Sequence, residues 1–221
     1  MPLPFRDRVE AGRALAHKLE SYRGQEDVLV LALPRGGVPI AFEVSRAIEA
    51  PLDIYLVRKL GVPGHEELAI GAIASGGVRV LNHDVVYMTG IDEQGIDAIA
   101  EREQKEIERR ERTYRDGRPA AEIAGKTIIL IDDGLATGAT MLAAARAIRK
   151  QRPAKLVVAV PVSSPEVCDY FRKEVDEIVC AEMPTPFQAV GLWYDDFTQT
   201  SDEEVRELLD RSARTHAGPR W

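Results

Sequence analysis

Apolar residues along this chain occur in short, uninterrupted runs, and the runs alternate with longer segments whose apolar positions recur at helical spacing. The runs are rich in Val, Ile and Leu, which is typical of strands buried on both faces of a parallel sheet. They predict strands over residues 27–33, 52–60, 126–132, 155–162 and 175–182. The segments with helical spacing predict helices over residues 5–21, 38–50, 137–151 and 164–174. This alternation favours an α/β fold whose central, mostly parallel sheet is flanked by helices.

The segment from Asp92 to Arg115 differs, because charged residues fill most of its positions. Repeatedly, a Glu precedes a basic residue by one helical turn, which is the favourable order for ion pairs along a helix. These pairs are Glu101–Lys105, Glu106–Arg110, Glu108–Arg112 and Glu111–Arg115. The apolar stripe of this predicted helix is thin and consists of Ile96, Ile99, Ile107 and Tyr114. Two interpretations follow: a solvated helix that lies across the sheet, or a subunit contact or part of a lid.

The length of 221 residues suits a single domain over residues 1–221. We expect an insertion at about residues 82–120, a small hood at about residues 182–200 and a flexible tail over residues 214–221. No stretch approaches the ~20 apolar residues that a membrane span needs, and the N-terminal segment has no signal-peptide core. The sequence therefore predicts a cytoplasmic protein without a membrane partner.

Composition narrows the classes of partner. Acidic residues outnumber basic ones by 36 to 29, and the net charge is −7. Such a chain lacks the general basic surface that nucleic acids require, so no nucleic-acid partner is expected. Cys168 and Cys180 are too few and too isolated for a disulfide framework or a zinc site, and we predict two buried thiols in a reducing compartment.

One predicted strand runs directly into a small-residue turn, in the sequence IILIDDGLATGAT (128–140). A strand that ends in such a turn and opens a helix aims several backbone N–H groups at one point, where the positive end of the helix dipole adds to them. Gly138 and Ala139 leave room for a close approach, and the hydroxyl groups of Thr137 and Thr140 offer further donors. The turn lacks the lysine and the spacing of a P-loop. We therefore predict that it binds a phosphate group.

Two carboxylates, Asp132 and Asp133, directly precede this turn. A phosphate group would avoid them, but a sugar diol would not, because carboxylates accept strong hydrogen bonds from neighbouring hydroxyl groups. The ligand should therefore carry a phosphate at one end and a diol close by. Ribose 5-phosphate has that shape.

The stretch from 128 to 140 closely resembles the thirteen-residue signature of the type I phosphoribosyltransferases. The resemblance implies that Asp132 and Asp133 hold the ribose hydroxyl groups of phosphoribosyl pyrophosphate (PRPP). It implies that the turn holds the 5-phosphate, through Gly134, Leu135, Ala136, Thr137, Gly138, Ala139 and Thr140. The implied reaction transfers the 5-phosphoribosyl group from PRPP to a nitrogen of a nucleobase-like acceptor and releases pyrophosphate. A role in nucleotide metabolism, a homodimer, and Mg²⁺ bound mainly through substrate oxygens and water are implied as well.

The loop after the first predicted strand, PRGG, would be a tight turn if it were taken alone. In the family, the corresponding loop binds pyrophosphate through backbone N–H groups. Gly36 and Gly37 would allow that geometry, and Arg35 would add charge.

The segment VRKLGVPGHEELAIGAI follows the second predicted strand and resembles the R-K-x-G-x-P-G stretch of adenine-type members. The resemblance implies that Arg58 and Lys59 face the pyrophosphate and that the following loop closes over it. Plain surface charges are the alternative. Glu67, or its neighbour Glu66, is the candidate to take a proton from the acceptor, with an exposed loop acid as the alternative.

Four aromatic residues lie close together after the last predicted strand: Phe187, Trp193, Tyr194 and Phe197. One interpretation is a small satellite core. The stretch VGLWYDDF also loosely resembles the V-G-x-x-x-D-Y hood segment of purine-type members, with a spacing that differs by one residue. In the phosphoribosyltransferases a hood stacks an aromatic on the nucleobase, so the family resemblance implies that Phe187 and Trp193 contact the acceptor and that Asp195 or Asp196 lies near the metal.

Two other function classes fit part of the pattern. A non-catalytic PRPP-binding regulator would keep the pocket without turnover, although control of nucleic acids would need a basic face. A phosphohydrolase would use Asp132 or Asp133 as its nucleophile, but no D-x-D pattern is present. The acceptor is left open: Ala136 stands where 6-oxopurine members carry an Asp, which weakens an assignment to hypoxanthine or guanine.

Overall fold

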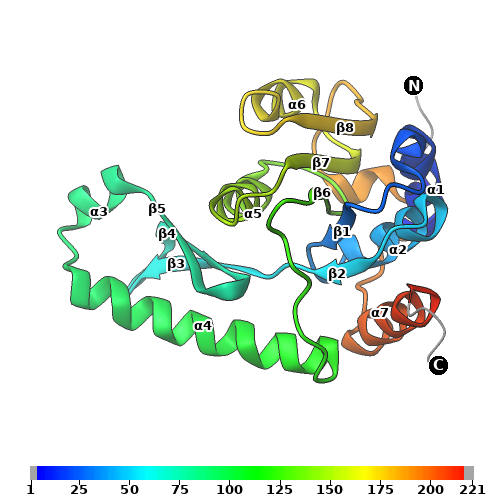
Figure 1. Cartoon of the computed structure of the whole chain (residues 1–221). Helices are drawn as coiled ribbons and strands as arrows, with labels where there is room; N and C mark the ends of the chain where they lie inside the picture. The colour runs from blue at the N-terminus through cyan, green and yellow to red at the C-terminus, as the bar shows by residue number, and fades with distance from the viewer. Residues whose placement is uncertain (1–3, 217–221) are drawn as a thin grey trace.

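The computed structural model describes residues 4–216, apart from the side chains of Glu66, Glu67 and His216. The core is a five-stranded sheet in the order β2-β1-β6-β7-β8, and every neighbouring pair is parallel (Figure 1). The strands are β1 (Val28–Ala32), β2 (Leu52–Ile54), β6 (Thr127–Ile131), β7 (Lys155–Val162) and β8 (Glu177–Glu182). The predicted α/β fold with a central parallel sheet is confirmed.

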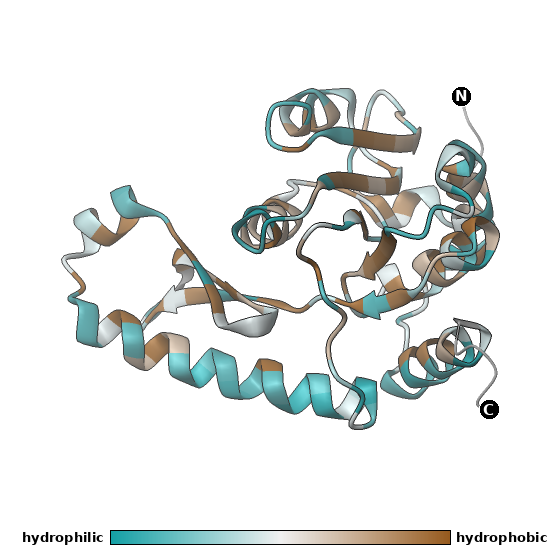
Figure 2. Ribbon diagram, viewed as in Figure 1, coloured by the Kyte–Doolittle hydropathy of each residue, from teal (hydrophilic) through white to brown (hydrophobic). Residues whose placement is uncertain are grey.

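Alternation along the strands divides the core into two layers, because successive strand residues point to opposite faces of a sheet. In β1, Val28 and Val30 face one layer, whereas Leu29 and Leu31 face the other. The first layer packs against α1 (Arg8–Lys18), α2 (Gly37–Ile48) and α7 (Asp202–His216), and the second against α5 (Ala139–Lys150) and α6 (Pro165–Phe171). Since both faces are covered, β1 and β6 are buried at every position, and the core strands are largely hydrophobic in Figure 2.

A second sheet forms an arm that projects from the core (Figure 1). Its strands are antiparallel, in the order β3 (Val57–Val62), β4 (His65–Ala74) and β5 (Val78–Leu81). The helices α3 (His83–Thr89) and α4 (Glu93–Arg115) follow, and we use "arm" for residues 57–115. The sequence did not predict this sheet. The arm begins well before the insertion expected from about residue 82.

The prediction of one strand over residues 52–60 is wrong, because this segment belongs to two sheets. The N–H of Tyr55 still donates to Ala32 of the core at 2.9 Å, but that of Leu56 donates to Ser75 Oγ of the arm at 2.9 Å. Tyr55 and Leu56 are both buried. The apolar run therefore continues through the break, and the hydrophobic pattern gives no sign of it.

The charged helix α4 covers one face of the arm sheet. Its apolar stripe is buried in one cluster with the arm strands, through Ile96, Ile99, Ile107, Leu60 and Ile70. Two ion pairs fasten the helix: Glu103 pairs with Arg58 of β3 at 2.6 Å, and Arg115 pairs with Asp53 of β2 at 2.9 Å. The helix thus covers the arm rather than the core sheet, and a role as lid or subunit contact stays a prediction.

Short 3₁₀ turns complete the described chain: η1 (Glu20–Tyr22), η2 (Ser75–Gly77) and η3 (Val190–Trp193).

The prediction of two thiols is wrong, because Cys168 of α6 and Cys180 of β8 form a disulfide. Their proximity arises from tertiary packing that the sequence does not show. Helix α7 extends to His216 and so includes Arg214, which was expected in the tail; residues 217–221 lie outside the described residues. Within residues 4–216, no helix has the length and apolar character that crossing a membrane would require.

Candidate functional site

The predicted phosphate-binding turn lies between the end of β6 and the start of α5. Leu135 anchors it: this residue is buried, its N–H donates to the Val162 carbonyl at 3.0 Å, and its carbonyl accepts from Ser163 Oγ at 3.3 Å. Gly138 takes a left-handed conformation (φ 71°) just before α5, and a β-carbon there would lie 2.6 Å from the Phe171 ring. Leu135 and Gly138 therefore shape the turn. Its exposed residues are Ala136, Thr137, Ala139 and Thr140.

The PRGG loop after β1 lies directly against the acid pair. A β-carbon on Gly36 would lie 2.0 Å from Asp133 Oδ2, and one on Gly37 would lie 2.7 Å from the backbone of β6. So close an approach requires glycine. The peptide bond between Pro34 and Arg35 is cis. The structure thus brings together the loop predicted to bind pyrophosphate and the acids predicted to bind the diol.

The two acids have different surroundings. The carboxyl group of Asp132 is enclosed by protein although the residue as a whole is partly exposed, and its Oδ1 accepts the N–H of Asp133 at 2.8 Å. Burial and the neighbouring charge of Asp133 raise the pKa of Asp132 to about 8. The raised pKa favours the protonated form of Asp132, which can donate as well as accept a hydrogen bond.

Arg8, in the first turn of α1, occupies one side of Asp133. Its Nε and Nη2 donate to Asp133 Oδ2 at 3.1 and 2.9 Å. The Tyr194 hydroxyl donates to the backbone carbonyl of Asp133 at 2.6 Å; burial and the Asp133 charge raise the pKa of Tyr194, which keeps this donor protonated. Sequence reasoning missed Arg8, because it lies 125 positions from Asp133 and no motif surrounds it.

Two of the predicted cations are paired away from the acids. Arg35 forms an ion pair with Asp202 at the start of α7, at 3.7 Å. Arg58 donates to Glu103 of α4 at 2.6 Å. Arg58 and Lys59 are neighbours within β3, so the pleat directs them to opposite faces of the arm sheet. The structure does not bring both of them to one ligand.

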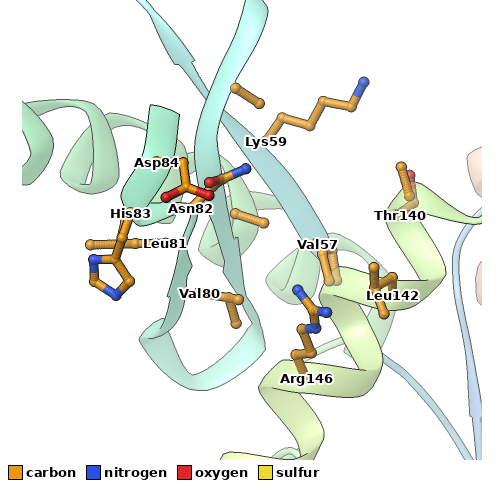
Figure 3. A pocket seen from close by; sticks show the side chains of 15 residues that line it. Val57, Lys59, Val80, Leu81, Asn82, His83, Asp84, Thr140, Leu142 and Arg146 are labelled. Carbon is orange, nitrogen blue, oxygen red and sulfur yellow. The ribbon is translucent and has the colours of Figure 1, made fainter. Parts of the chain in front are cut away.

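Lys59 lines a cavity of about 480 Å³ between the arm and α5 (Figure 3). The walls are mostly small and apolar, and the polar lining residues are Lys59, Asn82, His83, Asp84, Thr140 and Arg146. Figure 3 shows Lys59 on the arm strand and Thr140 on the facing helix. Of the two arm cations that were predicted from sequence, Lys59 is therefore the one that lies beside the turn predicted to bind phosphate.

The hood aromatics form a small cluster of their own. Tyr194 is buried in it, and Phe187 and Trp193 pack partly buried against it. The hood also reaches the turn, because a β-carbon on Gly134 would lie 2.6 Å from the Val190 side chain. The satellite core is thus present in the structure, and a role of Phe187 and Trp193 in binding the acceptor stays a prediction.

The contacts of Asp195, predicted to lie near the metal, and of Glu67, predicted to accept a proton, do not define a role for either residue. Asp195 is exposed, and its N–H donates to the Phe5 carbonyl at 2.8 Å. Across the described residues, no group of three or more His, Cys, Asp or Glu side chains could hold a metal. Glu67 belongs to β4, and its side chain lies outside the described part of the structure.

Known proteins resemble this chain over most of its length. The family described as phosphoribosyl transferase domain matches residues 6–195. Two proteins from Mycobacterium tuberculosis strains, both named "Putative phosphoribosyl transferase", are 47% identical over 213 residues, which cover 96% of this chain and 48% of each relative. The chain thus spans about half the length of these curated relatives. The crystal structure of TT1426 from Thermus thermophilus matches with a TM-score of 0.82 and 41% identity, over 94% of this chain and 98% of that chain.

Proposed function

The chain belongs to the phosphoribosyl transferase family, and we propose that it moves the 5-phosphoribosyl group of PRPP to a nitrogen of a nucleobase-like acceptor, with release of pyrophosphate. One observation carries the proposal: the acid pair, the glycine loop and the phosphate turn meet where β1 and β6 end. Open α/β sheets commonly bind ligands at this carboxyl edge.

In the proposed complex, the exposed part of the turn holds the 5-phosphate. The first turn of α5 contributes its N–H groups and the positive end of its dipole, and Thr137 and Thr140 contribute hydroxyl groups. The acid pair holds the ribose diol. Asp133 accepts from one hydroxyl group, whereas Asp132 can donate or accept because of its raised pKa.

The reaction breaks the bond between ribose C1 and a pyrophosphate oxygen, forms a bond between C1 and the acceptor nitrogen, and removes a proton from that nitrogen. Negative charge develops on the leaving pyrophosphate, so fixed donors beside it lower the barrier. We assign this role to the backbone of Gly36 and Gly37 and to Lys59. Arg35 could join after releasing Asp202, since that ion pair is long and partly exposed. Glu67 is the proposed acceptor of the proton.

Arg58 is less suited to the pyrophosphate than the sequence implied. Its partner Glu103 is 7% exposed. If Arg58 left this ion pair to bind the pyrophosphate, the contact between α4 and the arm sheet would be weakened. A buried carboxylate that loses its partner is costly. We therefore assign Arg58 to the stability of the arm and keep Lys59 for the substrate.

Mg²⁺ is the proposed cofactor and would neutralise charge on the pyrophosphate oxygens when it is bound. Asp195 is the proposed protein carboxylate near it. The acceptor is expected beneath the hood, where Val190 meets Gly134 and where Phe187 and Trp193 supply aromatic surface. The proposal includes a homodimer that acts in nucleotide metabolism in the cytoplasm.

A non-catalytic PRPP-binding regulator is the second candidate, because Arg35 and Arg58 are both engaged in ion pairs instead of facing the acid pair. One experiment separates the two. The protein is incubated with Mg²⁺, PRPP and each member of a panel of purine, pyrimidine and other nitrogen heterocycles, and pyrophosphate is measured.

An enzyme releases pyrophosphate only when its acceptor is present, and an Asp132→Asn, Asp133→Asn double variant should lose this release. Binding of PRPP is followed in parallel through the melting temperature, since a ligand at a hundredfold excess over its Kd stabilises by about 2.7 kcal/mol. Stabilisation without pyrophosphate release across the whole panel would support the regulator. Absence of any PRPP effect would overturn both candidates.

A further inference from the structure

The N-terminal segment and the hood are joined into one unit beside the acid pair. The N–H of Phe5 donates to the Trp193 carbonyl at 2.9 Å, and the Phe5 carbonyl accepts from the N–H of Asp195 at 2.8 Å. The N–H of Asp196 donates to the Arg6 carbonyl at 2.8 Å. These bonds join the two segments around a single parallel β-bridge between Phe5 and Tyr194. Any residue just beyond Arg6 is therefore held in a fixed place relative to the hood.

Arg8 projects from this unit onto Asp133. Two of its nitrogens donate to Asp133 Oδ2, and the third, Nη1, donates to the Thr198 carbonyl at 2.7 Å. The guanidinium lies 4.2 Å from the centroid of the Phe197 ring, and the Arg8 side chain is 11% exposed. Because every nitrogen of the planar guanidinium has a partner, its orientation is determined on all sides.

The orientation of the Asp133 carboxylate is determined as a consequence. Oδ2 lies between the Arg8 guanidinium and Gly36, and the backbone carbonyl of Asp133 is held by Tyr194. In residues 4–216, no hydrogen-bond donor is recorded at the other oxygen, Oδ1, and the Asp133 side chain keeps 18% of its exposure. Oδ1 therefore has lone pairs available to a hydroxyl group that enters the site.

We propose that Arg8 is a positioning residue for the ribose of PRPP: by holding Oδ2 of Asp133, it presents Oδ1 to a ribose hydroxyl group. This inference rests on the proposed function. Arg8 also offsets the charge of Asp133, which would otherwise repel the phosphate groups of the donor. A lysine at this position could supply the charge but not the fork that reaches both Asp133 and Thr198.

The test compares Arg8→Gln and Arg8→Lys with Arg6→Gln, a control at an exposed arginine of the same segment whose recorded ion-pair partner is Glu10. Calorimetry measures the Kd of Mg²⁺–PRPP and, separately, the Kd of inorganic phosphate. Arg8→Gln should raise the Kd of PRPP about tenfold, the typical effect of a lost hydrogen bond to a charged group. Arg8→Lys should restore little of that loss. The Kd of phosphate should change far less in both variants, because phosphate binds at the turn, and Arg6→Gln should match the wild type.

A double variant distinguishes positioning from a general structural role. Since Arg8 acts through Asp133, Arg8→Gln combined with Asp133→Asn should bind PRPP about as well as Asp133→Asn alone. The inference is overturned if folded Arg8→Gln binds PRPP like the wild type, or if its effect adds in full to that of Asp133→Asn. If Arg8→Gln does not fold, the PRPP affinity of Arg8→Lys is compared with that of the wild type, and that of Arg8→Lys combined with Asp133→Asn is compared with that of Asp133→Asn alone. Failure of the wild type to bind PRPP would instead refute the proposed function, and this inference with it.

Discussion

Two consecutive charged residues reach the same site at the edge of the core sheet, whereas in the arm two consecutive charged residues point to opposite faces. At the edge, Asp132 and Asp133 lie beyond the end of β6, and both reach the same site. In the arm, Arg58 and Lys59 lie within β3, and the pleat directs one to α4 and the other to the cavity beside α5. Two consecutive charges within a regular strand therefore face different sides of the sheet, whereas two that follow the end of a strand can reach one site.

The two regions also differ in how they are supported. The acid pair is contacted by residues from three distant segments, namely Arg8, Gly36 and Tyr194. The arm is held by its own sheet and by α4, with Arg115 and Asp53 as a largely buried ion pair at its junction with the core. Substitutions of Arg8, Gly36 or Asp133 should therefore act mainly on the binding of the ligand, whereas most substitutions in the arm should act on stability. Asp132, whose carboxyl group is enclosed by protein, should affect stability as well.

The largest expected effect concerns the pH dependence of stability at the edge. Asp132 titrates near pH 4 in the unfolded chain, but its pKa in the folded protein is about 8. Because the pKa of Asp132 is higher in the folded protein than in the unfolded chain, folding takes up a proton between these values, so the stability of the ligand-free protein should fall as the pH rises from about 4 to about 8. Asp132→Asn should remove this dependence and be most stabilising at pH 8.

Urea unfolding at pH 5 and pH 8 measures the effect. Asp116→Asn, at the exposed end of α4, is a matched control for the loss of one carboxylate. If Asp132→Asn stabilised the protein equally at both pH values, the carboxyl group of Asp132 would be charged in the native state. The two acids would then be equivalent.

Gly36→Ala should have the next largest effect. The backbone of Gly36 has φ −60°, which alanine adopts freely, so the variant should fold. Its β-carbon would lie 2.0 Å from Asp133 Oδ2, which forces the carboxylate to move by an ångström or more. Displacement on that scale can cost about a hundredfold, so the affinity for PRPP should fall by that order.

A double variant tests the mechanism of that loss. With Asp133→Ala, the clash is absent, so adding Gly36→Ala should change the affinity for PRPP little. A further large loss would show that Gly36 acts through the pyrophosphate loop and not through Asp133.

The acid pair and the turn that follows it could be predicted from sequence because these parts of the site are contiguous in the chain. The acids and the turn follow one another within residues 132–140, and the buried strand before them has an unmistakable apolar run. Arg8 could not be predicted, since a single arginine at the start of an amphipathic helix resembles any surface charge. Its role arises only when α1 packs beside the end of β6.

The arm escaped prediction for a related reason. Strand β4 mixes charged, small and apolar residues, because one face packs under α4 while the other lines a cavity. Such a strand shows neither a continuous apolar run nor strict alternation. The core strands could be predicted because both of their faces are covered by helices of the same chain.

The last and smallest effect tests the comparison between edge and arm directly. Lys59→Met should lower kcat/KM about tenfold, the scale of one lost hydrogen bond to a charged group, and leave the urea midpoint nearly unchanged because Lys59 is exposed.

Arg58→Met should lower stability and leave catalysis nearly unchanged. It removes one partner of the largely buried Glu103, which keeps its other partner, Arg102, at 3.1 Å. The free energy of unfolding should therefore fall by about 1–3 kcal/mol while kcat/KM stays within about twofold. Arg79→Met, at another arm arginine that pairs with a residue of α4 (Asp97), controls for the loss of one positive charge from the arm. If Arg58→Met lowered kcat/KM as much as Lys59→Met without loss of stability, both cations would act on the substrate. The arm would then have to rearrange when PRPP binds, because a regular strand cannot present two consecutive side chains to one ligand.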